Sequence, residues 1–289
     1  ETRNKEIKTL TPENFSEVFN DSLSPGIKDK IKNLNIQYVD ITPDEKDACI
    51  KECIRILLDP TLEVSGEHRL EKWEKGWGEN FEALKSGKNA ALLPLYFKKD
   101  EIVRWKQRWI KPLKSGFDFN VLSIILAWLF EKYVVGASYI YEFGCGTGHH
   151  LLRLREFNKT AKIYGLDWAE TSQKIIKEML SRGLLENTFC KKFDFFNPDK
   201  SFLLDKKSVV YTVGALEQVG EKHDKFINYL IKNKPKVCFH IEPIAELLDP
   251  DNLLDFLSIE YFKKRNYLRN FLTSLRSLES EGRIKIHDA

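Results

Sequence analysis

A glycine-rich loop carries the strongest chemical signal in the sequence. It follows the apolar run 139–143 and reads Gly144, Cys145, Gly146, Thr147 and Gly148. Glycine permits positive φ angles and lets a ligand approach the backbone closely, while the N-terminus of a following helix presents free N–H groups. These properties predict a bound ligand that contains a nucleoside.

The spacing of the glycines separates the ligands that such loops bind. A dinucleotide loop reads GxGxxG, but the position where its last glycine would fall is His149. The GxxxxGKS or GxxxxGKT loop that cradles the phosphates of ATP is absent from the sequence. NAD and ATP therefore fit poorly, and a nicotinamide-dependent oxidoreductase is the last of the alternatives.

Two acidic residues follow the next two apolar runs of the chain. Asp167 and Trp168 come directly after one run, and Asp194 and Phe195 come after the other. Taken singly, Asp167 could be a helix cap and Asp194 a turn residue. Their order after the glycine loop instead favours one shared ligand site.

Together these motifs resemble those of the class I S-adenosylmethionine-dependent methyltransferases, whose first motif is an acidic residue followed by GxGxG. Glu142 is that acidic residue here, and the resemblance covers about residues 137–289. It implies S-adenosylmethionine as the cofactor, with Asp167 receiving both ribose hydroxyls and Asp194 accepting the adenine amino group. One carboxylate has acceptor capacity for two O–H donors. The residues that the resemblance assigns to the cofactor are Glu142, Gly144, Cys145, Gly146, Gly148, Asp167, Trp168, Asp194, Phe195, Thr212 and Gly214.

Four ionisable residues are candidates for removing a proton from a methyl acceptor. The fourth apolar run ends in residues 211–218, the loop that in this family faces both cofactor and acceptor. The candidates in and after this loop and at the end of the fifth run are Glu217, His223, His240 and Glu242. The alternatives are a solvated histidine for His223, a core histidine for His240 and a cap of the next segment for Glu242. No third ligand lies nearby in sequence, so we predict no metal.

Short apolar runs alternate with helical stretches from residue 138 onward. The runs are 139–143, 162–166, 188–193, 208–213 and 236–241. The helical stretches are 148–157, 169–182 and 219–232, followed by a helical pattern over 251–280 and a last short strand over 283–287. This alternation predicts a Rossmann-like, doubly wound, mostly parallel α/β sheet, whose ligand site lies at the carboxyl ends of its strands.

Residues 1–136 are expected to form a mainly helical lid or substrate region beside a catalytic domain over 137–289. The apolar stripe of the predicted helix 67–84 is typical of core packing. Tyr96 and the run 104–109 place tryptophans and arginines at four-residue spacing on adjacent helical faces. Such a surface could hold a nucleic-acid strand, a cofactor carboxylate or an anionic substrate. The alternative is a packed helix with a solvated basic edge.

The composition excludes several classes of protein. The chain has 289 residues, is 42% hydrophobic and carries 46 basic and 43 acidic side chains, a net charge of +3. It is therefore globular and lacks the basic excess of a dedicated nucleic-acid binder. Five cysteines without zinc or redox spacing indicate reduced thiols and a cytoplasmic location. The longest apolar run, 121–130, is too short to span a bilayer.

The leading hypothesis is methyl transfer from S-adenosylmethionine to an oxygen or nitrogen of a small molecule, such as a sugar or an anionic metabolite. One alternative is a protein or RNA methyltransferase that uses the basic stretch 98–114. Another is a cofactor-binding interaction protein without catalysis, because the loop after the fourth run has no Asp/Asn-Pro-Pro-Tyr/Phe signature.

The sequence ends directly after the last predicted strand, so we expect the native polypeptide to continue past Ala289. Because the sequence starts at Glu1 and not at Met, it does not exclude a targeting segment that has been removed.

Overall fold

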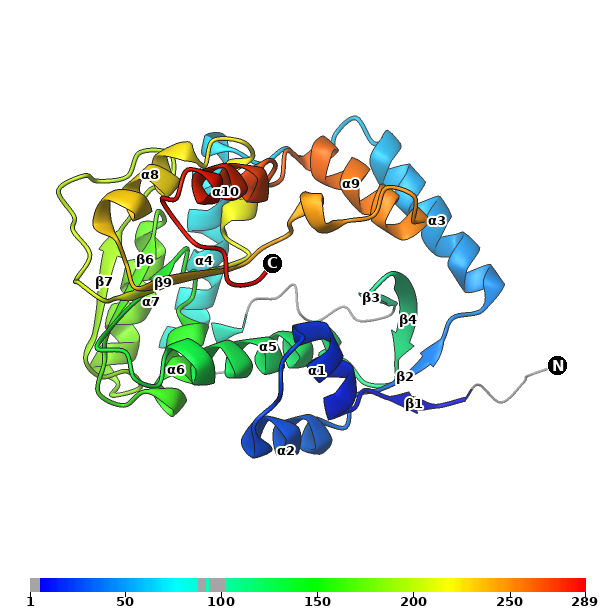
Figure 1. Cartoon of the computed structure of the whole chain (residues 1–289), viewed down its shortest axis with the longest axis horizontal. Helices are drawn as coiled ribbons and strands as arrows, with labels where there is room; N and C mark the ends of the chain where they lie inside the picture. The colour runs from blue at the N-terminus through cyan, green and yellow to red at the C-terminus, as the bar shows by residue number, and fades with distance from the viewer. Residues whose placement is uncertain (1–5, 88–91, 94–101) are drawn as a thin grey trace. The chain divides into compact units, whose positions relative to one another are not determined.

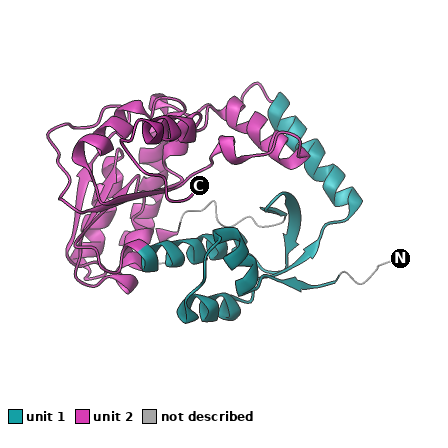
Figure 2. Ribbon diagram, viewed as in Figure 1, with its two compact units in different colours: residues 1–58, 95–132 teal, residues 59–94, 133–289 magenta. Residues whose placement is uncertain are grey.

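The computed structural model describes residues 6–87, 92–93 and 102–289, and its contacts divide the chain into two compact units (Figures 1 and 2). Unit 1 comprises Glu1–Leu58 and Leu95–Lys132, and unit 2 comprises Asp59–Pro94 and Tyr133–Ala289. Tyr96 and the first part of the basic stretch, 98–101, lie outside the described residues.

Unit 2 contains a five-stranded parallel sheet with the order β7-β6-β5-β8-β9. Its strands are β5 (Tyr139–Phe143), β6 (Lys162–Asp167), β7 (Thr188–Lys192), β8 (Val209–Val213) and β9 (Val237–Ile241). The five strands predicted from the alternating runs are all present, and the predicted doubly wound, Rossmann-like fold is confirmed. From β5 the chain first adds β6 and β7 on one side of β5, and it then adds β8 and β9 on the other side. The direction in which strands are added therefore reverses between β5 and β8. The carboxyl ends of the strands at this reversal are where open α/β sheets bind ligands.

The helices of unit 2 are mostly those expected. They are α4 (Leu70–Lys85), α6 (His149–Phe157), α7 (Glu170–Ser181), α8 (Asp224–Asn233), α9 (Leu253–Arg265) and α10 (Phe271–Ser280), with short 3₁₀ turns η1 (Glu67–Arg69), η4 (Leu216–Val219) and η5 (Ala245–Leu247). The predicted helix 219–232 begins later, because Gly220 has a φ of +60° and separates η4 from α8. The helical pattern 251–280 forms two helices, because Asn266 and Asn270 adopt left-handed φ angles.

The expected last strand over 283–287 is wrong. These residues have no strand structure, and the backbone N–H of Ile286 donates to the Glu279 carboxylate at 2.6 Å. A side chain of α10 thus takes the donor that a strand would use for pairing.

Aromatic side chains fill the core of unit 2 beneath the ligand-facing edge. Phe143, at the end of β5, is fully buried, and its ring centroid lies 4.6 Å from that of Phe193 and 5.2 Å from that of Phe226. Phe195 in turn lies 4.7 Å from Phe226. The strands of a parallel sheet are buried on both faces, which explains why they read as continuous apolar runs in the sequence.

Unit 1 is only partly helical, so the expectation of a mainly helical region was incomplete. Its elements are β1 (Lys8–Thr9), α1 (Pro12–Phe19), α2 (Pro25–Leu34), β2 (Gln37–Asp40), α3 (Pro43–Leu58), β3 (Val103–Trp105), β4 (Arg108–Pro112) and most of α5 (Phe117–Tyr133). The four strands form an antiparallel sheet with the order β1-β2-β4-β3.

The tryptophan–arginine run 104–109 is a β-hairpin, and its interpretation as a helical surface is wrong. Arg104 pairs with Trp109 and Trp105 with Arg108 across β3 and β4, and Lys106 takes a left-handed φ of 54° in the turn. Trp105 is buried, with its ring 5.4 Å from that of Phe15. The two Arg-Trp pairs are four residues apart, which fits one face of a helix, but here they lie on the two arms of a tight hairpin.

Residues 59–94 belong to unit 2 and not with the rest of the expected N-terminal region. Their helix α4 packs against α7, and its Leu84 is fully buried. The structural division therefore differs from the expected boundary at 136/137. Within the described residues, no helix combines the length and apolarity needed to cross a bilayer.

Candidate active site

The glycine loop joins β5 to α6 with three left-handed residues. Gly144, Gly146 and Gly148 have φ angles of +73°, +53° and +73°. The backbone N–H groups of Gly144 and Cys145 donate to the Leu166 carbonyl at 2.7 and 3.0 Å, which fixes the loop to β6. Residues with side chains rarely adopt such angles, so the glycines are required by the backbone path itself.

Close neighbours surround the same glycines. A Cβ atom on Gly144 would lie 2.2 Å from the Cβ of Ala215, and one on Gly146 would lie 2.9 Å from Cζ2 of Trp77. Ala215 belongs to the loop after β8, and Trp77 belongs to α4. The loop is therefore flanked by the two segments from which an acceptor site would be built.

Asp167 links the end of β6 to the glycine loop. The side chain is buried, and its carboxylate accepts the N–H of Gly146 at Oδ2 and that of Ala169 at Oδ1, both at 2.9 Å. Burial raises the pKa of Asp167 to about 6, although the two backbone hydrogen bonds oppose the shift. Each carboxylate oxygen keeps acceptor capacity beyond one N–H, so Asp167 can still receive hydroxyl donors.

Glu142 lies beneath the loop in a buried hydrogen-bonded group. One carboxylate oxygen is 2.8 Å from Nδ1 of His150, and the other accepts the Tyr211 hydroxyl at 2.9 Å. Burial raises the pKa of Glu142 to about 8 and lowers that of His150 to about 3. Burial therefore disfavours the charged form of each group, and the two side chains form a buried hydrogen bond.

Aromatic residues gather beyond β6 and β7, where the resemblance places adenine. The ring centroid of Trp168 lies 6.0 Å from that of Phe196, and Phe195 Cε2 lies 3.6 Å from a Cβ built on Gly144. Asp194 accepts the N–H of Phe196 at 2.8 Å, which is the turn contact considered in the sequence. Its second oxygen remains for a donor.

Glu242 and His240 hold the loop that follows β8. The Glu242 carboxylate accepts the N–H groups of Ala215 and Glu217 at 3.1 and 3.3 Å, and burial raises its pKa to about 7. His240 Nδ1 lies 2.9 Å from the hydroxyl of buried Thr212, and burial lowers the pKa of the imidazole to about 4. These are the contacts of a capping carboxylate and a core histidine.

The two remaining candidates differ in their surroundings. His223 is 2% exposed, with Nε2 2.8 Å from the Arg269 carbonyl, so it is not a solvated histidine. Glu217, on η4, receives the Gln218 amide at 2.8 Å, and burial raises its pKa. Gly214, with a φ of +56°, starts the turn that presents Glu217. The contact of Glu217 is thus with a neighbouring side chain, whereas Glu242 and His223 contact backbone groups of other segments.

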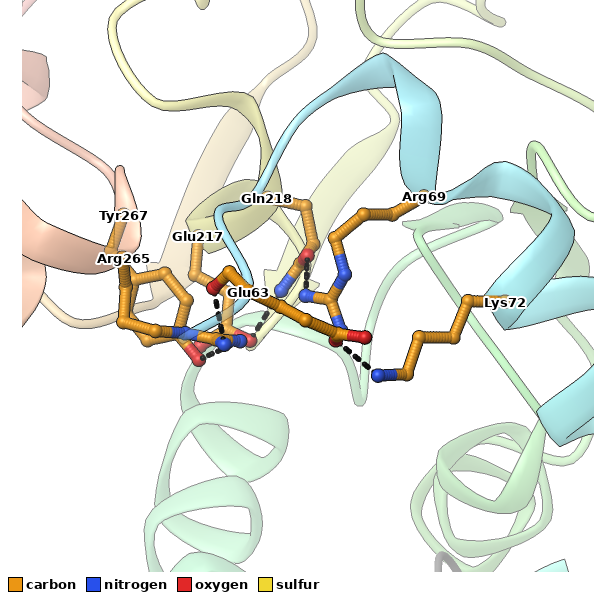
Figure 3. Close-up of polar contacts among 7 residues, drawn as sticks. All are labelled: Glu63, Arg69, Lys72, Glu217, Gln218, Arg265 and Tyr267. Atoms are coloured by element: carbon orange, nitrogen blue, oxygen red, sulfur yellow. Dashed lines mark hydrogen bonds and ion pairs between the residues drawn. The ribbon is translucent and has the colours of Figure 1, made fainter. Parts of the chain in front are cut away.

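A cluster of polar residues near Glu217 was missed in the sequence. Figure 3 shows it as Glu63, Arg69, Lys72, Glu217, Gln218, Arg265 and Tyr267, drawn from the segment before η1, from η1 and α4, from η4 and from the end of α9. We call these seven residues the arginine cluster. A signal was present, because Arg69, Trp73 and Trp77 recur every four residues and so share one helical face. The described residues contain no group of three His, Cys, Asp or Glu placed to hold a metal.

Glu74 anchors α4 to the start of α7. Its carboxylate accepts the N–H groups of Glu170 and Thr171 at 2.5 and 3.0 Å and the Thr171 hydroxyl at 2.6 Å. Free N–H groups at a helix N-terminus are stabilised by such acceptors. A side chain of α4 thus caps α7, and with it the aromatic stripe of α4 is fixed beside the glycine loop.

Replacing Glu74 with alanine is expected to loosen this attachment by about 0.5–2 kcal/mol, the usual cost of losing a helix cap. The measurement is hydrogen exchange at the amides of Glu170 and Thr171, which should become faster. Glu79→Ala, an exposed glutamate of the same helix, is the matched control and should leave both amides unchanged. Equal exchange in the two variants would contradict the capping role.

The fold and this site define a Rossmann-like α/β protein with a nucleoside-type glycine loop at the switch point of its sheet. No family model matches the chain, and no curated protein matches it significantly. Many solved structures share parts of the fold. PKMT2 from Rickettsia typhi, in complex with AdoHcy, is 22% identical over 40% of this chain and 24% of its own, with a TM-score of 0.32.

The chain is also similar to two solved structures of proteins described in other terms. The [4+2]-cyclase SpnF is 15% identical over 69% of this chain and 72% of its own, with a TM-score of 0.43. A protein described as a putative sarcosine dimethylglycine methyltransferase from Galdieria sulphuraria is 20% identical over 55% and 58%, with a TM-score of 0.41. The chain spans about a quarter of PKMT2. At these identities and TM-scores, the similarities do not establish the reaction of this chain.

Proposed function

We propose that the chain is an S-adenosylmethionine-dependent methyltransferase that acts on an oxygen or nitrogen of a small molecule. The observation that carries this proposal is the buried carboxylate of Asp167, bonded to the N–H of Gly146 at the switch point of the sheet. An acidic residue at the end of the second strand, tied to a GxGxG loop after the first, is the arrangement that the sequence motifs predict.

The residues at this edge fit the cofactor. Asp167 keeps acceptor capacity for the ribose hydroxyls, Asp194 keeps an oxygen for the adenine amino group, and Trp168 and Phe195 supply apolar faces for adenine. The positive φ angles of the loop let a ligand approach the backbone where side chains would obstruct it. Glu142 supports the loop from below through its buried contacts with His150 and Tyr211.

When bound, S-adenosylmethionine supplies an electrophilic methyl carbon on a positively charged sulfur. The protein's contribution is alignment in a water-poor site and, for a protonated acceptor, removal of a proton. Glu217 takes that proton, because its carboxylate lies on η4, two residues beyond the Ala215 that touches the glycine loop. Glu242 fixes the loop by accepting two of its backbone N–H groups. The five free cysteines support the cytoplasmic location proposed for the enzyme.

Calorimetric titration with S-adenosylmethionine, S-adenosylhomocysteine and NADH tests the proposal. Binding of the first two ligands and not of NADH is the expected result. Asp167→Asn should weaken S-adenosylhomocysteine binding by roughly 10–100-fold, because hydrogen bonds to a charged group contribute about 1.5–3 kcal/mol. Asp251→Asn, at an exposed position, is the control. Binding of NADH alone, or equal affinity in wild type and Asp167→Asn, would overturn the assignment.

A further inference from the structure

A line of side-chain contacts runs from the glycine loop along one face of α4. The Trp77 ring lies against Gly146, and the ring of Trp73 follows at a centroid distance of 5.3 Å. The guanidinium carbon of Arg69 lies 5.6 Å from the centre of the Trp73 ring, which is a cation–π distance. This face of α4 therefore connects the loop to the arginine cluster.

The same line returns to the glycine loop through the segment after β8. Arg69 Nη1 donates to the side-chain oxygen of Gln218 at 2.8 Å, and the Gln218 amide donates to Glu217, also at 2.8 Å. Ala215, two residues before Glu217, lies against Gly144. The arginine cluster and the glycine loop are thus joined at both ends, by α4 and by η4.

Three N–H donors along this line lack an acceptor among the described residues. They are Nε of Arg69, Nε of Arg265 and Nε1 of Trp73, all of them buried atoms. Arg69 as a whole is only 8% exposed. A buried donor left unpaired costs free energy, so native structures normally pair it with protein, water or ligand. The donors point to a ligand that supplies acceptor oxygens.

The charges of the cluster point to the same kind of ligand. Arg69, Lys72 and Arg265 carry three positive charges. The Glu63 carboxylate pairs with Arg69 and Lys72, and the uncharged carbonyl of the same residue accepts an N–H of Arg265 at 2.5 Å. The other partners of the two arginines, Gln218 and the Tyr267 hydroxyl, are uncharged. Glu217 is the second carboxylate of the cluster. The cationic side chains outnumber the carboxylates, and guanidinium groups bind carboxylates and phosphates through paired N–H donors.

We propose that Arg69 and Arg265 bind an anionic group, a carboxylate or a phosphate, of the methyl acceptor and so hold the acceptor beside Glu217 (Figure 3). This inference rests on the proposed function and adds to it the chemical class of the substrate. It also explains why Glu217 suits proton transfer. Burial raises the pKa of Glu217 while Arg265 and Arg69 oppose the rise, and a bound anion offsets the two arginines. The carboxylate is then a stronger proton acceptor when the substrate is present.

The test uses inorganic phosphate and malonate as probes of the anion site. Each is titrated by calorimetry into the full chain with S-adenosylhomocysteine present, at constant ionic strength. Arg69→Gln and Arg265→Gln are each expected to weaken probe binding by roughly tenfold or more, because a charge-assisted hydrogen bond is lost. Affinity for S-adenosylhomocysteine should stay unchanged. Tighter binding of phosphate indicates an acceptor with a phosphate group, and tighter binding of malonate indicates an acceptor with a carboxylate group.

Arg283→Gln is the matched control, because Arg283 is an exposed arginine of the same unit that pairs with Glu281. Probe binding that is absent in wild type, unchanged in Arg265→Gln, or weakened as much by Arg283→Gln overturns the inference. Arg265 is less buried than Arg69, so Arg265→Gln is expected to fold more readily, and it tests the anion site if Arg69→Gln does not fold. Arginine-dependent probe binding without any S-adenosylhomocysteine binding would support the anion site and refute the proposed methyltransferase function.

Discussion

Gly144→Ala is expected to lower the free energy of unfolding by roughly 2–5 kcal/mol and to abolish cofactor binding. Two effects add here. A non-glycine residue in the left-handed region costs about 1–2 kcal/mol, and forcing an extra carbon into a packed site costs about 1–3 kcal/mol. The added Cβ would lie 2.2 Å from the Cβ of Ala215, so the loop after β8 must move. Denaturant unfolding followed by circular dichroism measures the loss.

Gly214→Ala separates the two effects. Gly214 also has a positive φ, +56°, but a Cβ there would meet nothing within 4 Å, so only the backbone cost of about 1–2 kcal/mol is expected. The double variant Gly144→Ala with Ala215→Gly removes the Cβ of Ala215 with which the new side chain would clash. It should recover the part of the lost stability that comes from packing. If the double variant is no more stable than Gly144→Ala, the contact with Ala215 is not the cause.

Glu142→Leu is expected to lower the free energy of unfolding by about 2–6 kcal/mol, because each of two buried partners left unpaired costs roughly 1–3 kcal/mol. Those partners are Nδ1 of His150 and the hydroxyl of Tyr211. Glu142→Gln should cost far less, since its amide group can donate to His150 while its oxygen accepts from Tyr211. Urea unfolding of the three proteins at neutral pH gives the comparison. Equal losses in the Leu and Gln variants would contradict the hydrogen-bonding role of Glu142.

Glu142 also predicts a pH dependence of stability with a definite sign. Burial raises its pKa from 4.5 to about 8, so the folded state binds this proton more tightly than the unfolded state. The contribution to stability is fully present below pH 4.5 and is lost as the pH rises through about 8. The difference between wild type and Glu142→Gln isolates this group from Asp167, which faces the same loop and titrates with the same sign. A difference that is constant from pH 5 to 9 would refute the raised pKa of about 8.

The sheet of unit 2 could be predicted because its signals are local. The run 139–143 is apolar except for Glu142, and the glycine that follows it also has a defined backbone role. The hairpin of β3 and β4 could not be separated from a helix in the same way, because its tryptophans and arginines are spaced by four residues in either structure. The expected strand over 283–287 failed because strand formation depends on a partner that no local pattern records.

The residues of the candidate site likewise fall into those with local sequence signals and those whose contacts are distant in sequence. Asp167 and the glycines could be named as candidates because each motif lies within a few residues of a strand end. The roles of Glu242 and His223 depend on backbone groups far away in sequence, the N–H of Ala215 and the carbonyl of Arg269. Trp77 was interpreted as core packing, and only the folded chain places its ring on Gly146.

The attachment of α4 to α7 has a consequence for the order of events during synthesis. Glu74 and its partner Thr171 are 97 residues apart in the chain. At a translation rate of roughly 5–20 residues per second, α7 leaves the ribosome about 5–20 s after α4. For all of that interval Trp73 and Trp77 lack α7, and for most of it they also lack the glycine loop. The nascent chain thus exposes the apolar stripe of α4 until these partners have been synthesised.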